Sequence, residues 1–413
     1  MGEPTAALST DVTIDDVLSA RTRLEGVIRP TPTRLADSVS RALGRPVYLK
    51  PEHLQRAGSF KIRGAYNRIS RLDDGVDVVA ASAGNHAQGV ALASSLTGRR
   101  SVIFMPDSAS LPKVKATEGY GAEIIIGGPT LDDCLVLARD HAARTGAVFV
   151  PPFNDPLIIA GQATVGLEVA DEYGEGASAG VAPVILIPVG GGGLVAGMAF
   201  ALRQRMPDAI ILGIEAEGAA SMRRSLDEGR VVTLDATSTM ADGIALRAPG
   251  DITFAMTRSL VDDVITVTED EIAEAVLFLM ERAKAVVEPS GAVGVAALLA
   301  GRIAGSQPTV VVLSGGNVDP MLLTSIVTRG LSAAGRYLRL RIVFRDRPGS
   351  LAALTAVVAR LGLNVLDVEH HRTGVQIGVD QVEVLMVVET RNPEHRNNVI
   401  DTLRAEGFEA TLL

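Results

Sequence analysis

The sequence is poor in several residue types, and each shortage excludes a class of protein. Its 413 residues contain no tryptophan, and aromatic residues make up only 3%. The single cysteine, Cys134, excludes an intramolecular disulfide framework, so we expect a buried helical thiol and a reducing, cytoplasmic location. Basic residues number 39 against 48 acidic ones, and this net charge of −9 argues against nucleic-acid binding.

The sequence also shows no pattern typical of an export signal or of a membrane-spanning segment. The first sixteen residues lack the basic start and apolar centre of a secretion signal. Residues 176–202 carry no charge and are long enough to span a bilayer, but Pro183, Pro188 and four consecutive glycines interrupt them. We therefore expect a buried strand, a loop and a helix in this stretch, and no membrane partner.

The residues that are abundant are typical of a compact α/β protein. Hydrophobic residues make up 47% and charged residues 21%. Between about residues 47 and 312, short β-branched runs alternate with longer helical patterns, which indicates parallel βαβ units. The expected elements are strands at 77–82, 101–105, 124–126, 184–189, 210–214 and 309–313, and a helix at 85–96.

The pattern changes at residues 331–335, where small, flexible residues predict a domain boundary. We therefore divide the chain into domains 1–335 and 336–413. The second domain shows the order βαββαβ, which predicts a small ferredoxin-like sandwich. Its elements are expected at 336–344, 349–361, 365–371, 382–389, 393–406 and 408–412.

One candidate for chemistry is a lysine at the start of a predicted helix. Ser59 has the character of an N-cap, which would place Lys61 in the first turn. The helix dipole disfavours a cation there, so a neutral, nucleophilic amine is easier to reach. A lysine in a first turn is otherwise an ordinary solvated side chain.

A second candidate is the segment Ser82-Ala83-Gly84-Asn85-His86, which follows a predicted strand and opens a helix. Free backbone N–H groups at such a position attract a carboxylate or a phosphate. We expect His86 to be a packed, hydrogen-bonded histidine. Asn85 is better placed to contact a cofactor.

A third candidate is the run Gly190–Gly193, which lies between a predicted strand and a helix and lets the backbone curl around an anion. No Lys-Ser or Lys-Thr follows, so it is not a Walker loop. Gly191, Gly193 and Ala196 satisfy the dinucleotide pattern, and Glu215 lies near where a ribose-binding acid would. A nicotinamide-dependent oxidoreductase therefore remains an alternative, and so does a tight turn with close helix packing.

Two further segments lie at similar positions. Ser314 follows a strand and begins Ser314-Gly315-Gly316-Asn317, where its hydroxyl could point at a ring or the segment could be an ordinary turn. Glu288 and Ser290 precede a helix, where they could contact a ligand or cap the helix.

Together these motifs, in this order, resemble the fold type II pyridoxal-phosphate enzymes, and most closely the threonine and serine dehydratases. Residues 161–164 and 241–245 are similar to dehydratase segments as well. The resemblance implies an α/β, two-lobed, doubly wound catalytic domain of the tryptophan synthase β type, with a small lobe at about 50–155.

The resemblance also implies roles for the residues quoted above. Lys61 would carry pyridoxal 5'-phosphate, and Ser314 would meet its ring nitrogen. The other cofactor contacts would be Phe60, Asn85, Gly190, Gly191, Gly192, Gly193, Leu194 and Glu288. The substrate would lie on Ser82, Ala83, Gly84, Asn85 and His86.

The implied reaction is deamination of L-threonine to 2-oxobutanoate and ammonia, with L-serine giving pyruvate, as in isoleucine biosynthesis. A serine racemase, or another β-eliminating pyridoxal enzyme, would share almost all of these motifs. In related racemases a serine occupies the position of Ala83. Glu215, Ala219 and Ser221 repeat the spacing of a cation site in related enzymes, here for a monovalent ion or none.

Residues 336–413 resemble an ACT regulatory domain, with residues 345–351 as its strand-to-helix loop. Such domains usually pair and bind an amino acid at the interface, which implies a homodimer or homotetramer and an effector such as isoleucine or valine. The candidate effector contacts are Asp346, Pro348, Gly349 and Asn364. A dimerisation module, or a non-catalytic amino-acid sensor, is the alternative.

Overall fold

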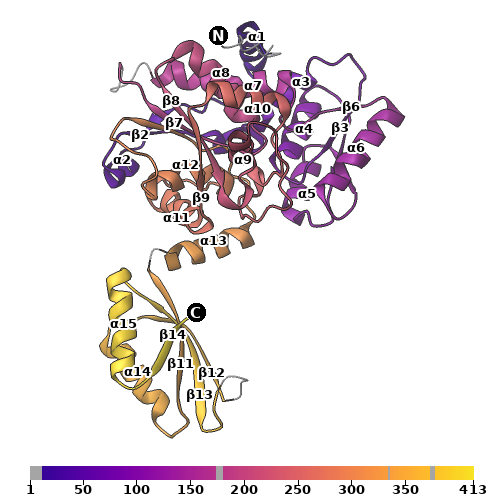
Figure 1. Ribbon diagram of the computed structural model, residues 1–413. Coiled ribbons are helices and arrows are strands. Elements are labelled where there is room, and N and C mark those ends of the chain that lie inside the picture. The colour runs from indigo at the N-terminus through magenta and orange to yellow at the C-terminus, as the bar shows by residue number, and fades with distance from the viewer. Residues whose placement is uncertain (1–11, 174–179, 334, 373–376) are drawn as a thin grey trace. The chain divides into compact units, whose positions relative to one another are not determined.

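The computed structural model describes residues 12–173, 180–333, 335–372 and 377–413 (Figure 1). Contacts divide the chain into two units, Met1–Leu323 and Thr324–Leu413. The division falls inside helix α13 (Pro320–Ala333), ahead of the boundary that the sequence predicts after residue 335. Residues 176–179 of the uncharged stretch lie outside the described residues.

The larger unit contains two sheets. The first has six strands, and β1 is antiparallel to β2 while every other neighbouring pair is parallel. Its order is β1 (Arg34–Leu35), β2 (Val47–Lys50), β10 (Thr309–Val312), β7 (Val184–Pro188), β8 (Ile210–Ala216) and β9 (Asp263–Val267).

The second sheet forms the small lobe of this unit, and its strands are all parallel. Its order is β5 (Glu123–Ile126), β4 (Ser101–Met105), β3 (Val78–Ala81) and β6 (Val148–Phe149). The six strands predicted between residues 77 and 313 are therefore confirmed. The sequence analysis missed β1, β2, β6 and β9.

Helices surround both sheets, and local signals fix several of their ends. Thr130 and Asp133 form a capping box at the start of α6, and Gly146, with φ 77°, ends that helix in the left-handed region. The helices are α1 (Ile14–Leu24), α2 (Asp37–Leu43), α3 (Lys61–Ile69), α4 (Asn85–Leu96), α5 (Leu111–Glu118), α6 (Leu131–Thr145), α7 (Pro156–Tyr173), α8 (Gly193–Arg205), α9 (Ser221–Glu228), α10 (Asp251–Leu260), α11 (Glu269–Phe278) and α12 (Pro289–Leu299).

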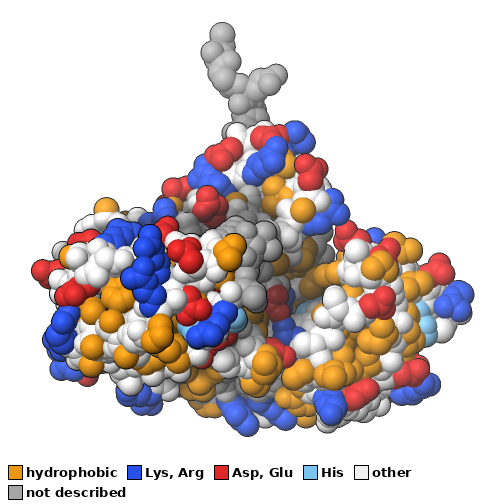
Figure 2. Space-filling view, turned by 90° about the horizontal axis from the view of Figure 1, so that it is seen from below, with side chains coloured by type: hydrophobic (Ala, Val, Ile, Leu, Met, Phe, Trp, Pro, Cys, Tyr) orange, Lys and Arg blue, Asp and Glu red, His pale blue; other side chains and the backbone are white. Residues whose placement is uncertain are grey.

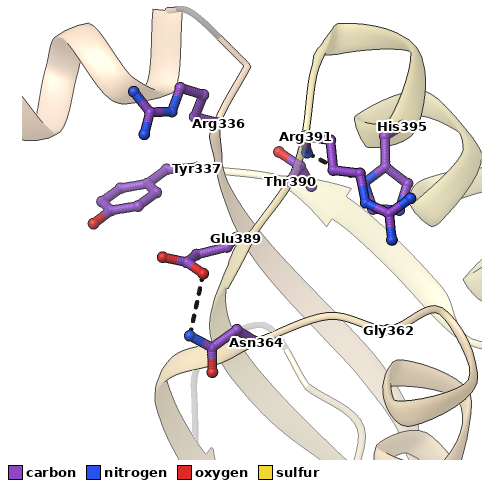
Figure 3. Close-up of a pocket in the computed structure, with 8 residues that line it drawn as sticks. All are labelled: Arg336, Tyr337, Gly362, Asn364, Glu389, Thr390, Arg391 and His395. Atoms are coloured by element: carbon purple, nitrogen blue, oxygen red, sulfur yellow. Dashed lines mark hydrogen bonds between the residues drawn. The ribbon is translucent and has the colours of Figure 1, made fainter. Parts of the chain in front are cut away.

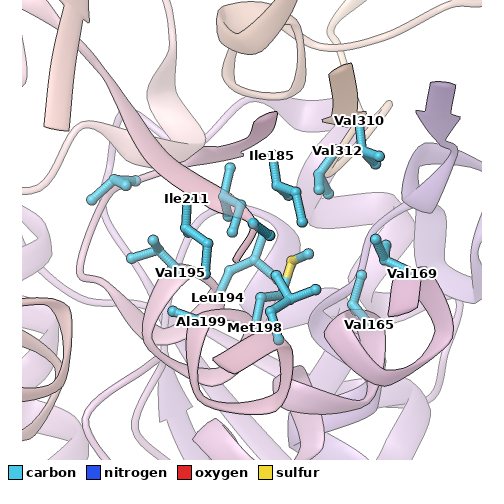
Figure 4. Packing of buried hydrophobic residues seen from close by; sticks show 14 of the residues in the cluster. Val165, Val169, Ile185, Leu194, Val195, Met198, Ala199, Ile211, Val310 and Val312 are labelled. Carbon is cyan, nitrogen blue, oxygen red and sulfur yellow. The ribbon is translucent and has the colours of Figure 1, made fainter. Parts of the chain in front are cut away.

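A large buried cluster joins α7 and α8 to the six-stranded sheet (Figure 4). The two helices approach closely, because a Cβ on Gly197 would lie only 2.6 Å from the carbonyl oxygen of Ile159. This packing fixes the start of α8 and, with it, the glycine run that precedes the helix. The cluster includes Val165, Val169, Ile185, Leu194, Val195, Met198, Ala199, Ile211, Val310 and Val312.

A buried ion cluster anchors α3. The Arg63 guanidinium is fully buried and donates to Glu52 at 2.8 Å and to Glu168 at 2.6 Å. Lys50, also buried, bonds Glu168 at 2.6 Å and Glu172 at 3.2 Å. Losing one partner would leave a buried charge unpaired, which typically costs about 3–5 kcal/mol, so this cluster holds the first turn of α3 firmly.

The smaller unit has an antiparallel sheet with two helices packed on one face. Its strand order is β12 (Val365–His371), β13 (Gln381–Glu389), β11 (Tyr337–Arg345) and β14 (Glu409–Leu412), and its helices are α14 (Ser350–Arg360) and α15 (Pro393–Ala405). Alternate residues of β11 and β13 are buried against the helices, including Leu340, Ile342, Val384 and Met386. The predicted βαββαβ order is confirmed.

The mixture of charges on the surface and the buried position of the single thiol match what the composition predicts. Figure 2 shows basic and acidic side chains intermingled over the face it draws, without a broad area of one sign. No helix among the described residues is long and apolar enough to cross a membrane. Cys134 is buried and free, and its thiol donates to the carbonyl oxygen of Gly127 at 3.1 Å.

Candidate active site

The predicted motifs meet at the carboxyl ends of strands from both sheets. One cleft brings together Phe60, Lys61, Asn85, Phe153, Gly190, Gly191, Gly192, Gly193, Leu194, Gly243, Ile244, Leu246, Glu288, Ser290 and Ser314. It adjoins a cavity of about 490 Å³ that contains the segment 82–86 together with Lys113, Asp242 and Asp319. Lys61, Asn85 and Glu288 line both spaces, so the cleft and the cavity form one site.

Lys61 is the first residue of α3, and Phe60 rather than Ser59 occupies the N-cap position. The prediction that Ser59 caps this helix is wrong, because Ser59 is extended, with φ −164°, and its buried hydroxyl has no hydrogen-bond partner among the described residues. The carbonyl oxygen of Phe60 instead accepts the N–H of Arg63 at 3.0 Å. The helix still begins with the lysine directed into the site.

The Lys61 amine lies in an unusual electrostatic environment. Its Nζ donates to the carbonyl oxygen of Pro152 at 3.1 Å and lies 5.2 Å from the centre of the Phe60 ring. Burial lowers the pKa of Lys61 to about 8, and the nearby Glu288 carboxylate opposes this shift. A substantial fraction of the amine is therefore neutral at physiological pH.

The glycine run links β7 to α8 and is packed from outside by other residues. A Cβ on Gly191 would collide with the Phe153 ring, and one on Gly193 would lie 2.9 Å from the Phe153 Cβ. Gly192 has φ 90°. The close-packing explanation that the sequence left open is therefore correct for this side of the run. Its other side lines the cleft, where the first N–H groups of α8 have no partner within the helix.

Glu288 occupies the N-cap position of α12, but its side chain belongs to a hydrogen-bond network and does not cap the helix. Its Oε1 accepts from Asn85 Nδ2 at 2.7 Å, and its Oε2 accepts from the Asn317 N–H at 3.1 Å. The Asn317 side chain also donates to Asn85 Oδ1 at 2.9 Å. Burial raises the pKa of Glu288 to about 7, and the charge of Asp242 adds to this shift. The sequence analysis did not assign Asn317 to the site, although it follows Ser314-Gly315-Gly316 directly.

Two hydroxyl groups border the cleft. Ser290 is buried, and its Oγ has no hydrogen-bond partner among the described residues. Ser314 lines the same cleft, and its carbonyl oxygen accepts the N–H of Phe60 at 3.2 Å. This bond ties the end of β10 to the start of α3. A buried hydroxyl without a partner is costly unless a ligand completes it.

The segment 82–86 lines the adjoining cavity at the start of α4, whose N-cap is Gly84. Ser82 and Ala83 both face this space, and Ser82 Oγ accepts the Gly84 N–H at 3.2 Å. His86 is buried, and its Nε2 lies 2.9 Å from the Val150 carbonyl oxygen. Burial, together with the charge of Lys61, lowers the pKa of His86 to about 3, so it is a neutral, packed histidine.

The sequence analysis also missed an ion pair across the cavity, between Lys113 on α5 and Asp242. Lys113 belongs to the small lobe and Asp242 to the large one, so this pair links the two lobes over the site. A lysine and an aspartate 129 residues apart give no local signal of this contact.

The environment of the Glu215 carboxylate differs from that of a ribose-binding carboxylate in a nucleotide site. Its carboxylate is fully buried and accepts the N–H groups of Met222 at 2.9 Å and Arg223 at 2.8 Å, so it caps α9. The dinucleotide interpretation is wrong, because this carboxylate is held on the helix and is not in the cleft. Burial raises its pKa to about 7.

The cation site at Glu215, Ala219 and Ser221 stays a prediction. Ser221 Oγ is buried without a hydrogen-bond partner among the described residues. No group of three or more His, Cys, Asp or Glu side chains comes together for a metal in the described ranges.

The predicted effector residues lie at opposite ends of the smaller unit's sheet. The Asp346 N–H donates to Asp380 before β13, whereas the carbonyl oxygen of Asn364 accepts the N–H of Glu389 at the end of β13. A single chain therefore does not bring Asn364 to Asp346, Pro348 and Gly349. Asn364 instead lines a pocket of about 290 Å³ with Arg336, Tyr337, Gly362, Glu389, Thr390, Arg391 and His395 (Figure 3).

The similarity of the chain to known proteins shows which family it belongs to. Residues 24–315 match the family described as pyridoxal-phosphate dependent enzyme, and residues 339–408 match the ACT domain. The chain belongs to the pyridoxal-phosphate-dependent enzymes. It is 40% identical over 405 residues to an L-threonine ammonia-lyase from Thermotoga maritima, covering 97% of this chain and 100% of the relative. It is 44% identical over 396 residues to one from Geobacter sulfurreducens, covering 95% and 97%.

Solved structures give the same result for the catalytic unit. A threonine deaminase from T.th. aligns with a TM-score of 0.71 and 40% identity, over 74% of this chain and 99% of that one. Maize serine racemase aligns with a TM-score of 0.71 and 36% identity, over 78% and 98%. The two-lobed type II fold with a C-terminal ACT domain is thereby confirmed.

The residues of the cleft fit pyridoxal phosphate. The glycine run and the N-terminus of α8 form an anion cradle, and the Ser290 hydroxyl, which has no hydrogen-bond partner in the described part of the chain, lines the same space. Lys61 would hold the cofactor, and Gly190–Gly193 with Leu194 would hold its phosphate. Phe60, Asn85, Glu288 and Ser314 line the remaining wall.

Gly192 offers a test of this cradle. A Cβ there would lie 2.8 Å from both Thr253 Cβ and Met222 Cε, so Gly192→Ala combines positive-φ strain with a collision inside the protein. We expect it to lower the free energy of unfolding by about 2–4 kcal/mol and to reduce the bound cofactor, measured by urea denaturation and visible absorbance.

The matched control is Gly98→Ala, because Gly98 also has a positive φ, 66°, but a Cβ there would meet open space. This variant should lose only about 1 kcal/mol and keep its cofactor. Equal losses of stability in the two variants would contradict the packing account of Gly192.

Proposed function

We propose that this protein is a threonine ammonia-lyase that converts L-threonine to 2-oxobutanoate and ammonia, and L-serine to pyruvate. The observation that carries the proposal is the Lys61 amine, lowered in pKa by burial and facing the glycine cradle. The printed names of the relatives, two of which align over almost the whole chain, support the same reaction.

The amine of Lys61 is suited to two tasks. As a neutral nucleophile it would bind the cofactor, and once displaced by the substrate's amino group it would remove the proton from the substrate's α-carbon. When bound, pyridoxal phosphate supplies a ring that stabilises the negative charge left on that carbon. The carbonyl oxygen of Pro152 would hold Lys61 Nζ in place between these tasks.

The cavity beside Lys61 would hold the amino acid itself. The N–H groups at the start of α4, around Ser82 to Asn85, would receive the α-carboxylate, because a helix N-terminus favours an anion. The Asn85–Glu288 pair would fix the side of the site nearest Ser314.

Lys61→Ala tests the proposal. We expect 2-oxobutanoate production to fall by more than about 1,000-fold, with loss of the cofactor's visible absorbance. Lys115→Ala is the matched control, because Lys115 is exposed on α5 outside the cleft and cavity. Retained activity in Lys61→Ala would remove this lysine from the mechanism.

Racemisation is a second candidate function, because maize serine racemase is a structural neighbour at 36% identity. Racemisation requires an acid on the face of the substrate opposite Lys61, and the methyl group of Ala83 cannot supply a proton. We therefore expect L-serine to give pyruvate with little D-serine. Ala83→Ser should raise the D-serine fraction by about tenfold or more, measured by chiral chromatography.

Abundant D-serine from the unmodified enzyme would contradict this expectation. Ser82→Ala would then show whether Ser82, which lines the same cavity, supplies the second proton.

The smaller unit would regulate the enzyme by binding an amino acid such as isoleucine or valine. Because Asn364 and the loop with Asp346, Pro348 and Gly349 lie at opposite ends of one sheet, a single binding site would need two copies of the domain. We therefore propose a homodimer or homotetramer. We also propose that the enzyme acts in the cytoplasm, in isoleucine biosynthesis.

Deleting residues 336–413 tests this regulation. All cofactor motifs lie before residue 320, so kcat should stay within about twofold while the response to isoleucine or valine disappears. Asn364→Ala in the full chain should weaken the response without changing kcat. A truncated enzyme that still responds would place the effector site in the catalytic unit.

A further inference from the structure

A second cavity, of about 510 Å³, shares walls with the active site. We call it the interlobe cavity, because its walls come from α6 and β6 of the small lobe and from residues 233–250 of the large lobe. Its volume lies in the range of small-molecule sites, about 300–1,000 Å³. Nothing in the reaction proposed above uses it.

The walls that it shares are those that position the catalytic groups. Pro152, whose carbonyl oxygen accepts Lys61 Nζ at 3.1 Å, lines both the interlobe cavity and the substrate cavity. Phe153, which packs against Gly191 and Gly193, lines the interlobe cavity and the cofactor cleft. Leu246 lines all three spaces.

The chemistry of the walls selects a ligand class. Leu135, Phe149, Phe153 and Leu246 make much of the lining apolar. Three charged residues also line it, Asp132, Arg139 and Arg247. Arg247 pairs with Asp132 across the lobes at 3.0 Å, so these two charges cancel.

Arg139 supplies the remaining charge. Its guanidinium lies 5.6 Å from the centre of the Phe149 ring and belongs to none of the ion pairs of the described residues. The cavity thus combines an apolar body with one available cation at an aromatic wall.

We propose that the interlobe cavity binds a small hydrophobic carboxylate, with its carboxylate on Arg139 and its body against Leu135 and Phe149. Occupancy would be transmitted to the active site through Pro152 and Phe153, since both residues line the interlobe cavity, Pro152 also accepts a hydrogen bond from Lys61, and Phe153 also packs against the glycine run. The proposal does not depend on which amino acid the enzyme deaminates.

Calorimetric titration of the full-length holoenzyme with 4-phenylbutyrate tests the proposal. We expect saturable binding of one ligand per chain, with a shift in the cofactor's visible absorbance. The neutral analogue 4-phenylbutanamide should bind about tenfold more weakly. Arg139→Gln should weaken the carboxylate by the same factor and leave the amide unchanged.

Leu135→Trp should fill the cavity and abolish binding of both probes. Its matched control is Leu137→Trp on the same helix, because Leu137 is 42% exposed and does not line the cavity. The chain has no other tryptophan, so the fluorescence of either variant reports whether it is folded. Arg144→Gln is the charge control, an arginine of α6 outside the cavity.

Three results would overturn the proposal. One is the absence of binding by the unmodified enzyme at millimolar 4-phenylbutyrate. Another is binding that survives in folded Leu135→Trp, which would place the probe in the active site or the ACT domain. The third is equal loss in Arg139→Gln and Arg144→Gln, which would reduce the charge effect to general electrostatics.

Discussion

The site depends on one buried amine whose hydrogen bond goes to a neutral carbonyl oxygen and not to a carboxylate. Lys61 and Arg63 are two residues apart at the start of α3, yet their environments differ completely. Arg63 is enclosed by Glu52 and Glu168, which raise its pKa. Lys61 Nζ donates to the neutral carbonyl oxygen of Pro152, and burial lowers the pKa of Lys61 although the Glu288 charge opposes this shift. One cation is therefore structural and permanent, and the other is free to lose its proton.

The rest of the catalytic unit maintains this difference. The ion cluster around Arg63 fixes α3, while the hydrogen bond from Phe60 to Ser314 ties the helix to the large sheet. Phe153 packs behind the glycine run and adjoins Pro152, so the segment that holds the amine also supports the anion cradle. The short segment between β6 and α7 therefore contacts both the catalytic amine and the glycine run.

Much of this arrangement could be predicted from the sequence, because the relevant signals are local. Buried parallel strands show as β-branched runs, and glycine or polar residues after them mark ligand-binding ends. Asn85, Gly190–Gly193 and Ser314 were found in this way, whereas Lys61 and Glu288 were found from their positions at the start of helices, and the structure brings all of them to one cleft. The two-residue strands β1 and β6 were missed because so short a run has no periodicity.

Contacts between distant segments could not be predicted. The Lys113–Asp242 pair and the bond from Asn317 to Asn85 join residues more than a hundred positions apart. Ser59 was assigned as a cap from its residue type, but backbone geometry gave that position to Phe60. Glu215 has the spacing of a ribose-binding acid, and only its bonds to α9 show that it serves a helix.

The central claim is that burial lowers the pKa of Lys61 to about 8, so that part of the amine is neutral near physiological pH, and the pH dependence of its reaction with added pyridoxal phosphate tests this most directly. Enzyme freed of cofactor should recover visible absorbance at a rate that rises with pH and levels off with a midpoint near 8. A midpoint near 10.5, the ordinary pKa of lysine, would contradict the account.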